Sequence, residues 1–139
     1  TGYEPELAEQ LAVHPEDEIF LPLQQLADLY AVVIGIGIPT RASDGINISM
    51  LIFQPSAERI VYSKRMLHKD EFPLFTSGKN QPFLNIEGLK MGLGICYETL
   101  QREHFLHAVE NQAKIYIASV AKPDRGLEKA YIHFPSMAK

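Results

Sequence analysis

The sequence predicts an α/β layered fold that contains a mixed sheet. Three observations lead to this prediction: segments with helical spacing alternate with short apolar runs, some neighbouring runs are separated only by turn residues, and no internal repeat interrupts the order. Short turns between apolar runs are typical of antiparallel hairpins, and helices between strands are typical of layered α/β folds.

Composition is that of an ordinary globular protein. The 139 residues are 46% hydrophobic and 22% charged, with a formal net charge of -4, and this length is enough for a real core. Clustered Lys and Arg are missing, so we expect no nucleic-acid partner, and the sequence contains no apolar run long enough to predict a membrane span. The single cysteine excludes an internal disulfide and favours a cytoplasmic location.

The first half should contain one helix followed by three strands. Pro15 suits the first turn of a helix, and acidic residues 16–18 would face the positive end of its dipole. The expected helix runs to Tyr30, with Phe20, Leu23, Leu26, Ala27 and Tyr30 on its apolar stripe. The expected strands are Ala31–Ile38, buried and ended by Pro39, then Ile46–Phe53 after the polar loop Thr40–Gly45, and Arg59–Ser63 after the turn Pro55–Glu58.

The second half begins with a long loop. Lys64–Pro82 has mixed charge and no clear periodicity, and loops of this length in compact domains are usually functional. After it we expect strands Phe83–Ile86 and Lys90–Cys96 joined at Glu87-Gly88, a helix Gln101–Gln112, a buried strand Ile115–Val120, and a helix from Gly126 that meets Pro135.

One segment, Gly92–Glu98 (GLGICYE), places the lone cysteine at the end of a strand with a helix soon after. Such a turn exposes a side chain beside backbone N–H groups that could bind an oxyanion. From the residues alone, Cys96 is either a reactive thiol of this kind or a small buried hydrophobic residue.

Two charged residues in the long loop are further candidates. Lys64 follows a predicted strand, where it could lower the pKa of a thiol and stabilise an oxyanion, or it could be a solvated surface lysine. Glu71 could orient that lysine or act on a proton, or it could be a loop carboxylate in water.

Five segments, in this order, together resemble the nitrilase, or carbon-nitrogen hydrolase, superfamily. They are Thr1-Gly2-Tyr3; Tyr62–Leu67 followed by Glu71 and Phe75–Gly78; Gly92–Glu98; Arg102-Glu103 with Ala108; and Ala113–Ser119. The resemblance covers nearly the whole chain and implies a four-layer α-β-β-α sandwich, of which this chain represents only part.

The resemblance also implies a site. Cys96 matches the nucleophile of the family's Glu-Lys-Cys triad, Lys64 matches the lysine, and Glu71 matches a further glutamate often counted with them. The backbone N–H of Tyr97 would complete the oxyanion site. The triad glutamate should precede the Thr-Gly-Tyr segment, so we expect residues 1–139 to be part of a single domain, truncated at both ends and inactive alone.

The implied reaction is hydrolysis of a small-molecule amide or nitrile through a thioester on Cys96, without metal or cofactor, in a homodimer or higher homo-oligomer. Met66 stands where the family commonly has His, and the Arg-Phe-Pro-Glu that usually follows the cysteine is missing. These departures leave open amidase, nitrilase and carbamoyl-amide substrates. The alternatives are a glutaminase domain that supplies ammonia to a synthetase, and a catalytically silent binding or assembly module.

Other signals favour structural roles. Gly35 and Gly37 lack the third glycine of a dinucleotide loop, so we interpret them as part of a strand. His104 and His107 lie three apart on an expected helix without further ligands, which favours surface or interface packing over metal binding. The aromatic residues Tyr97, Phe105, Tyr116 and Tyr131 are expected in the core rather than in a stacking platform.

Overall fold

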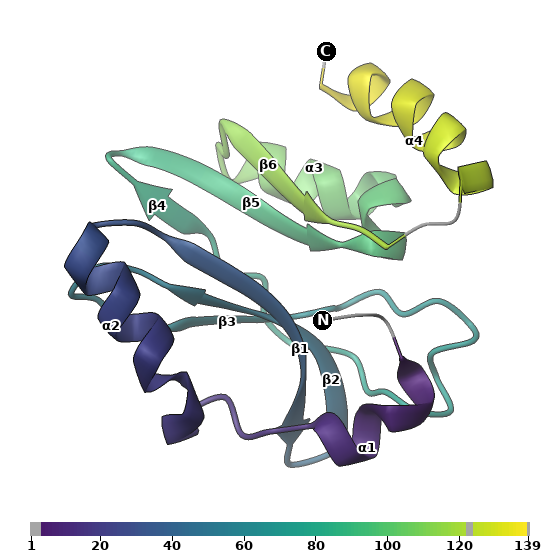
Figure 1. The fold of residues 1–139 in the computed structure, drawn as a ribbon. Coiled ribbons are helices and arrows are strands. Elements are labelled where there is room, and N and C mark those ends of the chain that lie inside the picture. Colours follow the sequence, from purple (N-terminus) through teal and green to yellow (C-terminus); the bar gives the residue numbers. More distant parts are fainter. Residues whose placement is uncertain (1–3, 122–123, 139) are drawn as a thin grey trace. The chain divides into compact units, whose positions relative to one another are not determined.

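The computed structural model describes residues 4–121 and 124–138, which belong to two compact units, Thr1–Pro82 and Phe83–Lys139 (Figure 1). Each unit contains a three-stranded sheet. No helix in the described part of the chain is both long and apolar enough to cross a bilayer.

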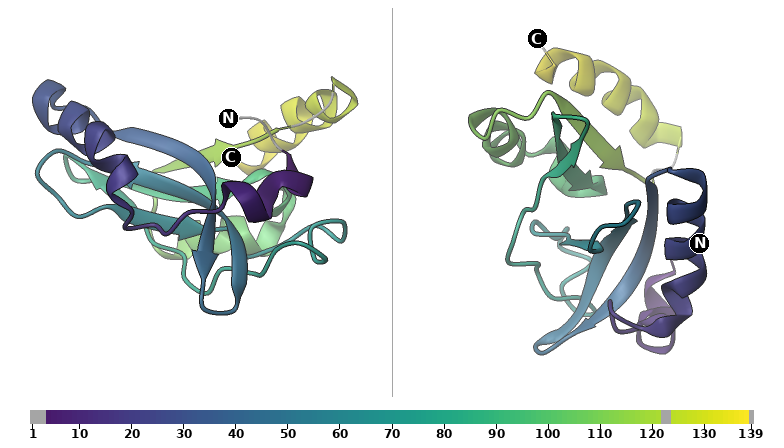
Figure 2. Two further views of the ribbon diagram at one scale, coloured as in Figure 1. Left: turned by 60° about the horizontal axis from the view of Figure 1, so that its bottom comes forward. Right: turned by 90° about the vertical axis from the view of Figure 1, so that its left-hand side faces the viewer.

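The first unit is an antiparallel sheet in the order β1-β2-β3, preceded by short helices. Its helices are η1 (Pro5–Leu7), α1 (Ala8–Leu11), η2 (Glu18–Phe20) and α2 (Leu21–Tyr30), and its strands are β1 (Ile34–Ala42), β2 (Gly45–Phe53) and β3 (Ile60–Ser63). Helix α2 runs along one face of this sheet (Figure 2), where Phe20 and Ala27 pack against Leu51 and Phe53 of β2.

The helix of the first unit begins later than the sequence predicts. Asp17 caps the 3-10 turn η2 that leads into α2, because its carboxylate accepts a hydrogen bond of 2.9 Å from the Ile19 N–H. The end at Tyr30 is confirmed. Leu26 and Tyr30 are 44% and 66% exposed, so the expected apolar stripe is correct only for its other members.

Strand β1 corrects a second expectation, because it passes through Pro39 and is only partly buried. Pro39 pairs with Ile48, and its carbonyl accepts a hydrogen bond from the Val13 N–H on the side away from β2. The nitrogen of a strand residue points to the same side as its carbonyl, so the missing N–H of Pro39 costs no hydrogen bond to β2. The expected polar loop accordingly shrinks to Ser43-Asp44, which joins β1 to β2.

The second unit contains the mixed sheet that the sequence predicts. Its elements are β4 (Leu84–Ile86), β5 (Leu89–Ile95), η3 (Cys96–Leu100), α3 (Arg102–Glu110), β6 (Ile115–Ser119) and α4 (Asp124–Met137). Strand β5 lies in the middle, antiparallel to β4 and parallel to β6, and α3 covers one face (Figure 1). The β4–β5 turn is Glu87-Gly88, as expected, with φ values of 50° and 79°.

Strand β6 is less buried than its apolar sequence predicts. Ile115 and Ile117 are 41% and 38% exposed, and Val120 just after the strand is 40% exposed. Among the described strands of this unit, β6 pairs only with β5, and an outer strand has fewer neighbours to cover its side chains.

The long loop after β3 contains no regular helix or strand, as predicted, but backbone hydrogen bonds tie it to the first sheet. Lys64 donates its N–H to Ile48, Thr76 donates to Ile46, and Gly78 donates to Lys64, each over 2.8 Å. A Cβ at Gly78 would lie 2.1 Å from the Ser63 carbonyl oxygen. Only glycine therefore allows the loop to return so closely beside Lys64.

Candidate active site

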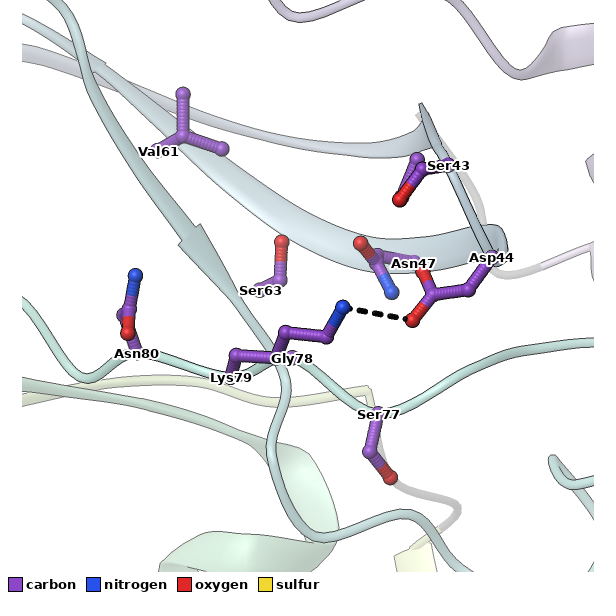
Figure 3. A pocket seen from close by; sticks show the side chains of 10 residues that line it. Ser43, Asp44, Asn47, Val61, Ser63, Ser77, Gly78, Lys79 and Asn80 are labelled. Carbon is purple, nitrogen blue, oxygen red and sulfur yellow. Dashed lines mark ion pairs between the residues drawn. The ribbon is translucent and has the colours of Figure 1, made fainter.

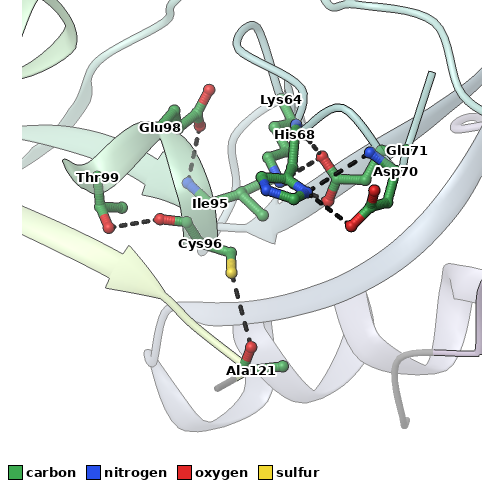
Figure 4. A network of polar contacts seen from close by, with 9 residues as sticks. All are labelled: Lys64, His68, Asp70, Glu71, Ile95, Cys96, Glu98, Thr99 and Ala121. Atoms are coloured by element: carbon green, nitrogen blue, oxygen red, sulfur yellow. Dashed lines mark hydrogen bonds and ion pairs between the residues drawn. The ribbon is translucent and has the colours of Figure 1, made fainter. Parts of the chain in front are cut away.

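Lys64 and Glu71 form a buried ion pair in the first unit. The Lys64 side chain is 0% exposed, and its Nζ donates to Glu71 Oε1 and Oε2 over 2.6 and 2.8 Å (Figure 4). A buried lysine without a counter-charge would be very costly, whereas this pair is compensated on both carboxylate oxygens. The alternatives of a solvated lysine and a solvated loop carboxylate are therefore wrong.

The loop also fixes the carboxylate of Glu71. Its Oε2 accepts a second hydrogen bond, of 2.6 Å, from the His68 N–H. The backbone carbonyl of Glu71 accepts hydrogen bonds from the N–H groups of Leu74 and Phe75. These contacts define the turn that carries Glu71. The arrangement holds the Lys64 ammonium in a fixed direction. A group that stabilises developing negative charge must be fixed in this way.

Cys96 lies at the junction between β5 and η3 in the second unit, so the expected strand end is confirmed. Its φ of 49° is in the left-handed region, which costs a residue with a Cβ roughly 1–2 kcal/mol. The Thr99 hydroxyl donates to the Cys96 carbonyl over 2.6 Å, and the thiol lies 3.6 Å from the Ala121 carbonyl oxygen. The side chain is partly exposed rather than fully buried.

Glu98, His104 and Tyr116 form a cluster of polar side chains beside this turn. Glu98 and His104 are 0% and 1% exposed, so of the surface or interface packing expected for His104 the structure excludes the surface position. His104 Nε2 lies 3.5 Å from Glu98 Oε2, and its Nδ1 lies 2.7 Å from the Tyr116 hydroxyl. In the described residues, neither His104 nor His107 joins a group of three or more potential metal ligands.

The two glycines of β5 are the sequence signal that could have revealed this cluster. A Cβ at Gly94 would lie 2.2 Å from the Tyr116 hydroxyl oxygen, and a Cβ at Gly92 would lie 2.9 Å from Ala108 Cβ. Both glycines therefore leave room for groups packed against the strand, and Gly94 leaves it for the tyrosine hydroxyl.

Tyr116 should remain protonated well above the range in which tyrosines usually ionise. Burial, and then the neighbouring Glu98 charge, raise the pKa of Tyr116 above its ordinary value of 10.0. The unfolded chain loses this proton first, so the free energy of unfolding should fall as the pH rises above 10.0. Tyr116→Phe should remove this part of the fall, measured by denaturant unfolding below and above that pH. Equal slopes for both proteins would contradict the prediction.

A separate shallow pocket of about 270 Å³ lies in the first unit, between the β1–β2 turn and the loop (Figure 3). Asp44 and Lys79 form an exposed ion pair of 3.0 Å at its edge, and the hydrogen bond from Lys79 lowers the pKa of Asp44. None of the site residues expected from the sequence lines it.

Comparison with known proteins decides the family. The model of the carbon-nitrogen hydrolase family matches residues 1–133. The chain belongs to the carbon-nitrogen hydrolase family. No curated protein sequence matches the chain.

Solved structures of this superfamily share the fold. XC1258 from Xanthomonas campestris, a CN-hydrolase superfamily protein, is similar with a TM-score of 0.87 and 14% identity, over 99% of this chain and 54% of its own. The NitN amidase from Nesterenkonia sp. AN1 is similar with a TM-score of 0.82 and 20% identity, over 98% of this chain and 55% of its own. Nit3 from Saccharomyces cerevisiae, a member of the nitrilase superfamily, is similar with a TM-score of 0.79 and 19% identity, over 99% of this chain and 52% of its own. The nitrilase-like α/β class is thus confirmed, and the chain spans about half the length of these carbon-nitrogen hydrolases.

Proposed function

We propose that the full-length carbon-nitrogen hydrolase cleaves an amide or nitrile of a small molecule, with Cys96 as its nucleophile. The observation that carries this proposal is the strained turn at Cys96, in a chain that belongs to this family. A strained conformation persists only where surrounding contacts hold it, and such positions are frequent at active sites. A variant of the Nesterenkonia amidase carries the acetamide moiety of fluoroacetamide on its active-site cysteine, which supports the same role for Cys96.

For an amide, the proposed reaction has two stages. The Cys96 sulfur attacks the carbonyl carbon, the carbon-nitrogen bond breaks, and the nitrogen leaves as ammonia or an amine after it takes up a proton. Water then attacks the thioester, releases the carboxylic acid and restores the thiol. A nitrile would first form a thioimidate, which takes up water and loses ammonia to reach the same thioester.

We assign the charged groups to the negative oxygen or nitrogen that develops in each stage. Lys64 supplies a fixed positive charge, Glu71 holds and orients it, and the N–H of Tyr97, next to Cys96 in the chain, donates a hydrogen bond. Both oxygens of Glu71 accept from the Lys64 ammonium, which compensates the burial of this positive charge. A homo-oligomer and a cytoplasmic location belong to the same proposal.

Ammonia release by the full-length protein tests this proposal. Small amides, ω-amides, carbamoyl amides and nitriles are supplied in turn, with Cys96→Ala as the blank, and the protein is then digested and searched for an acyl group by mass spectrometry. We expect release from at least one compound and an acyl mass on the peptide that contains Cys96.

Other results would favour the alternatives. Release from glutamine far above that from the other amides would support the glutaminase domain. No release from any compound, together with slow alkylation of Cys96 by iodoacetamide, would support the silent binding module and sink the proposed reaction.

A further inference from the structure

The left-handed turn at Cys96 needs support from both of its sides. On the carbonyl side, the Thr99 hydroxyl donates to Cys96 over 2.6 Å. On the amide side, the N–H of Ile95, the residue just before it, donates to Glu98 Oε1 over 2.7 Å (Figure 4). Glu98 therefore holds the last peptide of β5 where the chain changes direction.

Glu98 can do this only if its own buried carboxylate is compensated. It is 0% exposed, and a buried negative charge is costly unless hydrogen bonds and charges compensate it. His104 Nε2 lies 3.5 Å from its second oxygen, Oε2. One oxygen of Glu98 thus faces the strand end and the other faces the imidazole, which ties the orientation of the carboxylate to the position of His104.

Tyr116 in turn holds the imidazole. Its hydroxyl lies 2.7 Å from His104 Nδ1, and the two rings are nearly perpendicular, at 84°. In the neutral tautomer with a proton on Nε2, that N–H faces Glu98 Oε2, and Nδ1 accepts a hydrogen bond from the Tyr116 hydroxyl. The raised pKa of Tyr116 agrees with a hydroxyl that keeps its proton.

The cluster lies directly against the strand that delivers Cys96. A Cβ at Gly94 would lie 2.2 Å from the Tyr116 hydroxyl oxygen and 3.0 Å from Thr99 Cγ2. Gly92 pairs with Tyr116 across the parallel strands β5 and β6. Gly92 and Gly94, just before Cys96, therefore leave space beside the strand for the Tyr116 side chain.

We propose that the buried Glu98 and His104 form, together with the half-buried Tyr116, a relay that fixes the turn bearing Cys96, with His104 as its positioning residue. The inference rests on the proposed role of Cys96 as nucleophile. His104 does not touch the substrate in this account: it fixes Glu98, Glu98 fixes the Ile95 amide, and that amide fixes the direction of the thiol.

Variants of the full-length protein separate the links of the relay. His104→Leu removes both polar contacts, Tyr116→Phe removes one oxygen, and His104→Gln keeps a side-chain N–H that can reach Glu98. The readouts are kcat and KM for an amide that the wild type cleaves, and the rate of Cys96 alkylation, each normalised to folded protein. His107→Leu, on the same helix but outside the relay, is the matched control.

We expect His104→Leu to lower kcat and the alkylation rate about 10-fold, through the loss of its polar contacts with the buried Glu98 carboxylate and with Tyr116, with KM nearly unchanged. Tyr116→Phe should lower both by a smaller factor, His104→Gln should restore most of the rate, and His107→Leu should match the wild type. A role limited to packing would lower the melting temperature without this split between kcat and KM, and the glutamine would not rescue it.

Crystal structures of the same variants test the relay independently of activity. A Cys96 φ that leaves the left-handed region in His104→Leu supports the relay, even if no substrate is found. Wild-type geometry and wild-type rates in folded His104→Leu and Tyr116→Phe would overturn it. If instead the wild type shows neither turnover nor rapid alkylation while φ changes in the variants, the proposed reaction fails and the relay stands.

Discussion

Replacing Cys96 by glycine should abolish turnover and stabilise the fold at the same time. Loss of the nucleophile should lower kcat by about 10³-fold or more. The left-handed φ of 49° strains any residue with a Cβ but not glycine. After the greater flexibility of unfolded glycine is subtracted, the free energy of unfolding should rise by roughly 0.5–1 kcal/mol. Cys96→Ala should lose turnover equally but keep the strain.

Denaturant unfolding and ammonia release measure the two effects on the same protein. Glu87→Gly is the matched control, because Glu87 has a φ of 50° in the β4–β5 turn of the same unit. It should stabilise the protein without changing kcat. Turnover retained by Cys96→Gly would exclude the nucleophile assignment. Stabilisation by Glu87→Gly with destabilisation by Cys96→Gly would show that the turn at Cys96 is not strained in solution.

The local sequence predicts the strands and turns well but not which strands lie at an edge. β2, β3 and the β4–β5 hairpin occur where apolar alternation and turn residues place them. The apolar runs of β1 and β6 predict buried strands, whereas both strands are outer strands of the described sheets. Edge position depends on which strands pair, and residue composition along one strand carries little information about pairing.

The position of Cys96 at a strand end was predictable from the glycines and the following helix, whereas the surroundings of the candidate residues were not. Lys64 and Glu71 became candidates through the resemblance to the family. Burial of Lys64 depends on the loop hydrogen bonds to β2 and on the close return at Gly78. No periodicity in the sequence encodes those contacts.

The burial of His104 could not be predicted from the sequence either. On its helix it occupies an ordinary position, three residues before His107. In the fold it contacts Glu98, six residues earlier, and Tyr116, twelve residues later. These separations match neither the period of a helix nor that of a strand, so no sequence pattern predicts the contacts. The position that carried information was Gly94, where a side chain is missing because a hydroxyl lies against the backbone.

Breaking the Lys64–Glu71 pair should have the largest effect on stability in the first unit. Glu71→Leu leaves an ammonium group that is 0% exposed without its carboxylate. The lysine must then lose its proton or remain buried and uncompensated, so the free energy of unfolding should fall by about 3–5 kcal/mol. Lys64→Met should likewise destabilise, because it leaves the Glu71 carboxylate without its cation.

The double variant Lys64→Met with Glu71→Leu distinguishes the structural role of the pair from its chemical role. Apolar side chains of similar volume can replace a buried pair at little cost, so most of the lost stability should return. Turnover should not return, because the fixed positive charge is gone, and the expected loss is about 10²–10³-fold. The exposed pair Asp44–Lys79 is the control, since Lys79→Met should change neither property. Turnover that recovered together with stability in the double variant would show that Lys64 supports the fold alone.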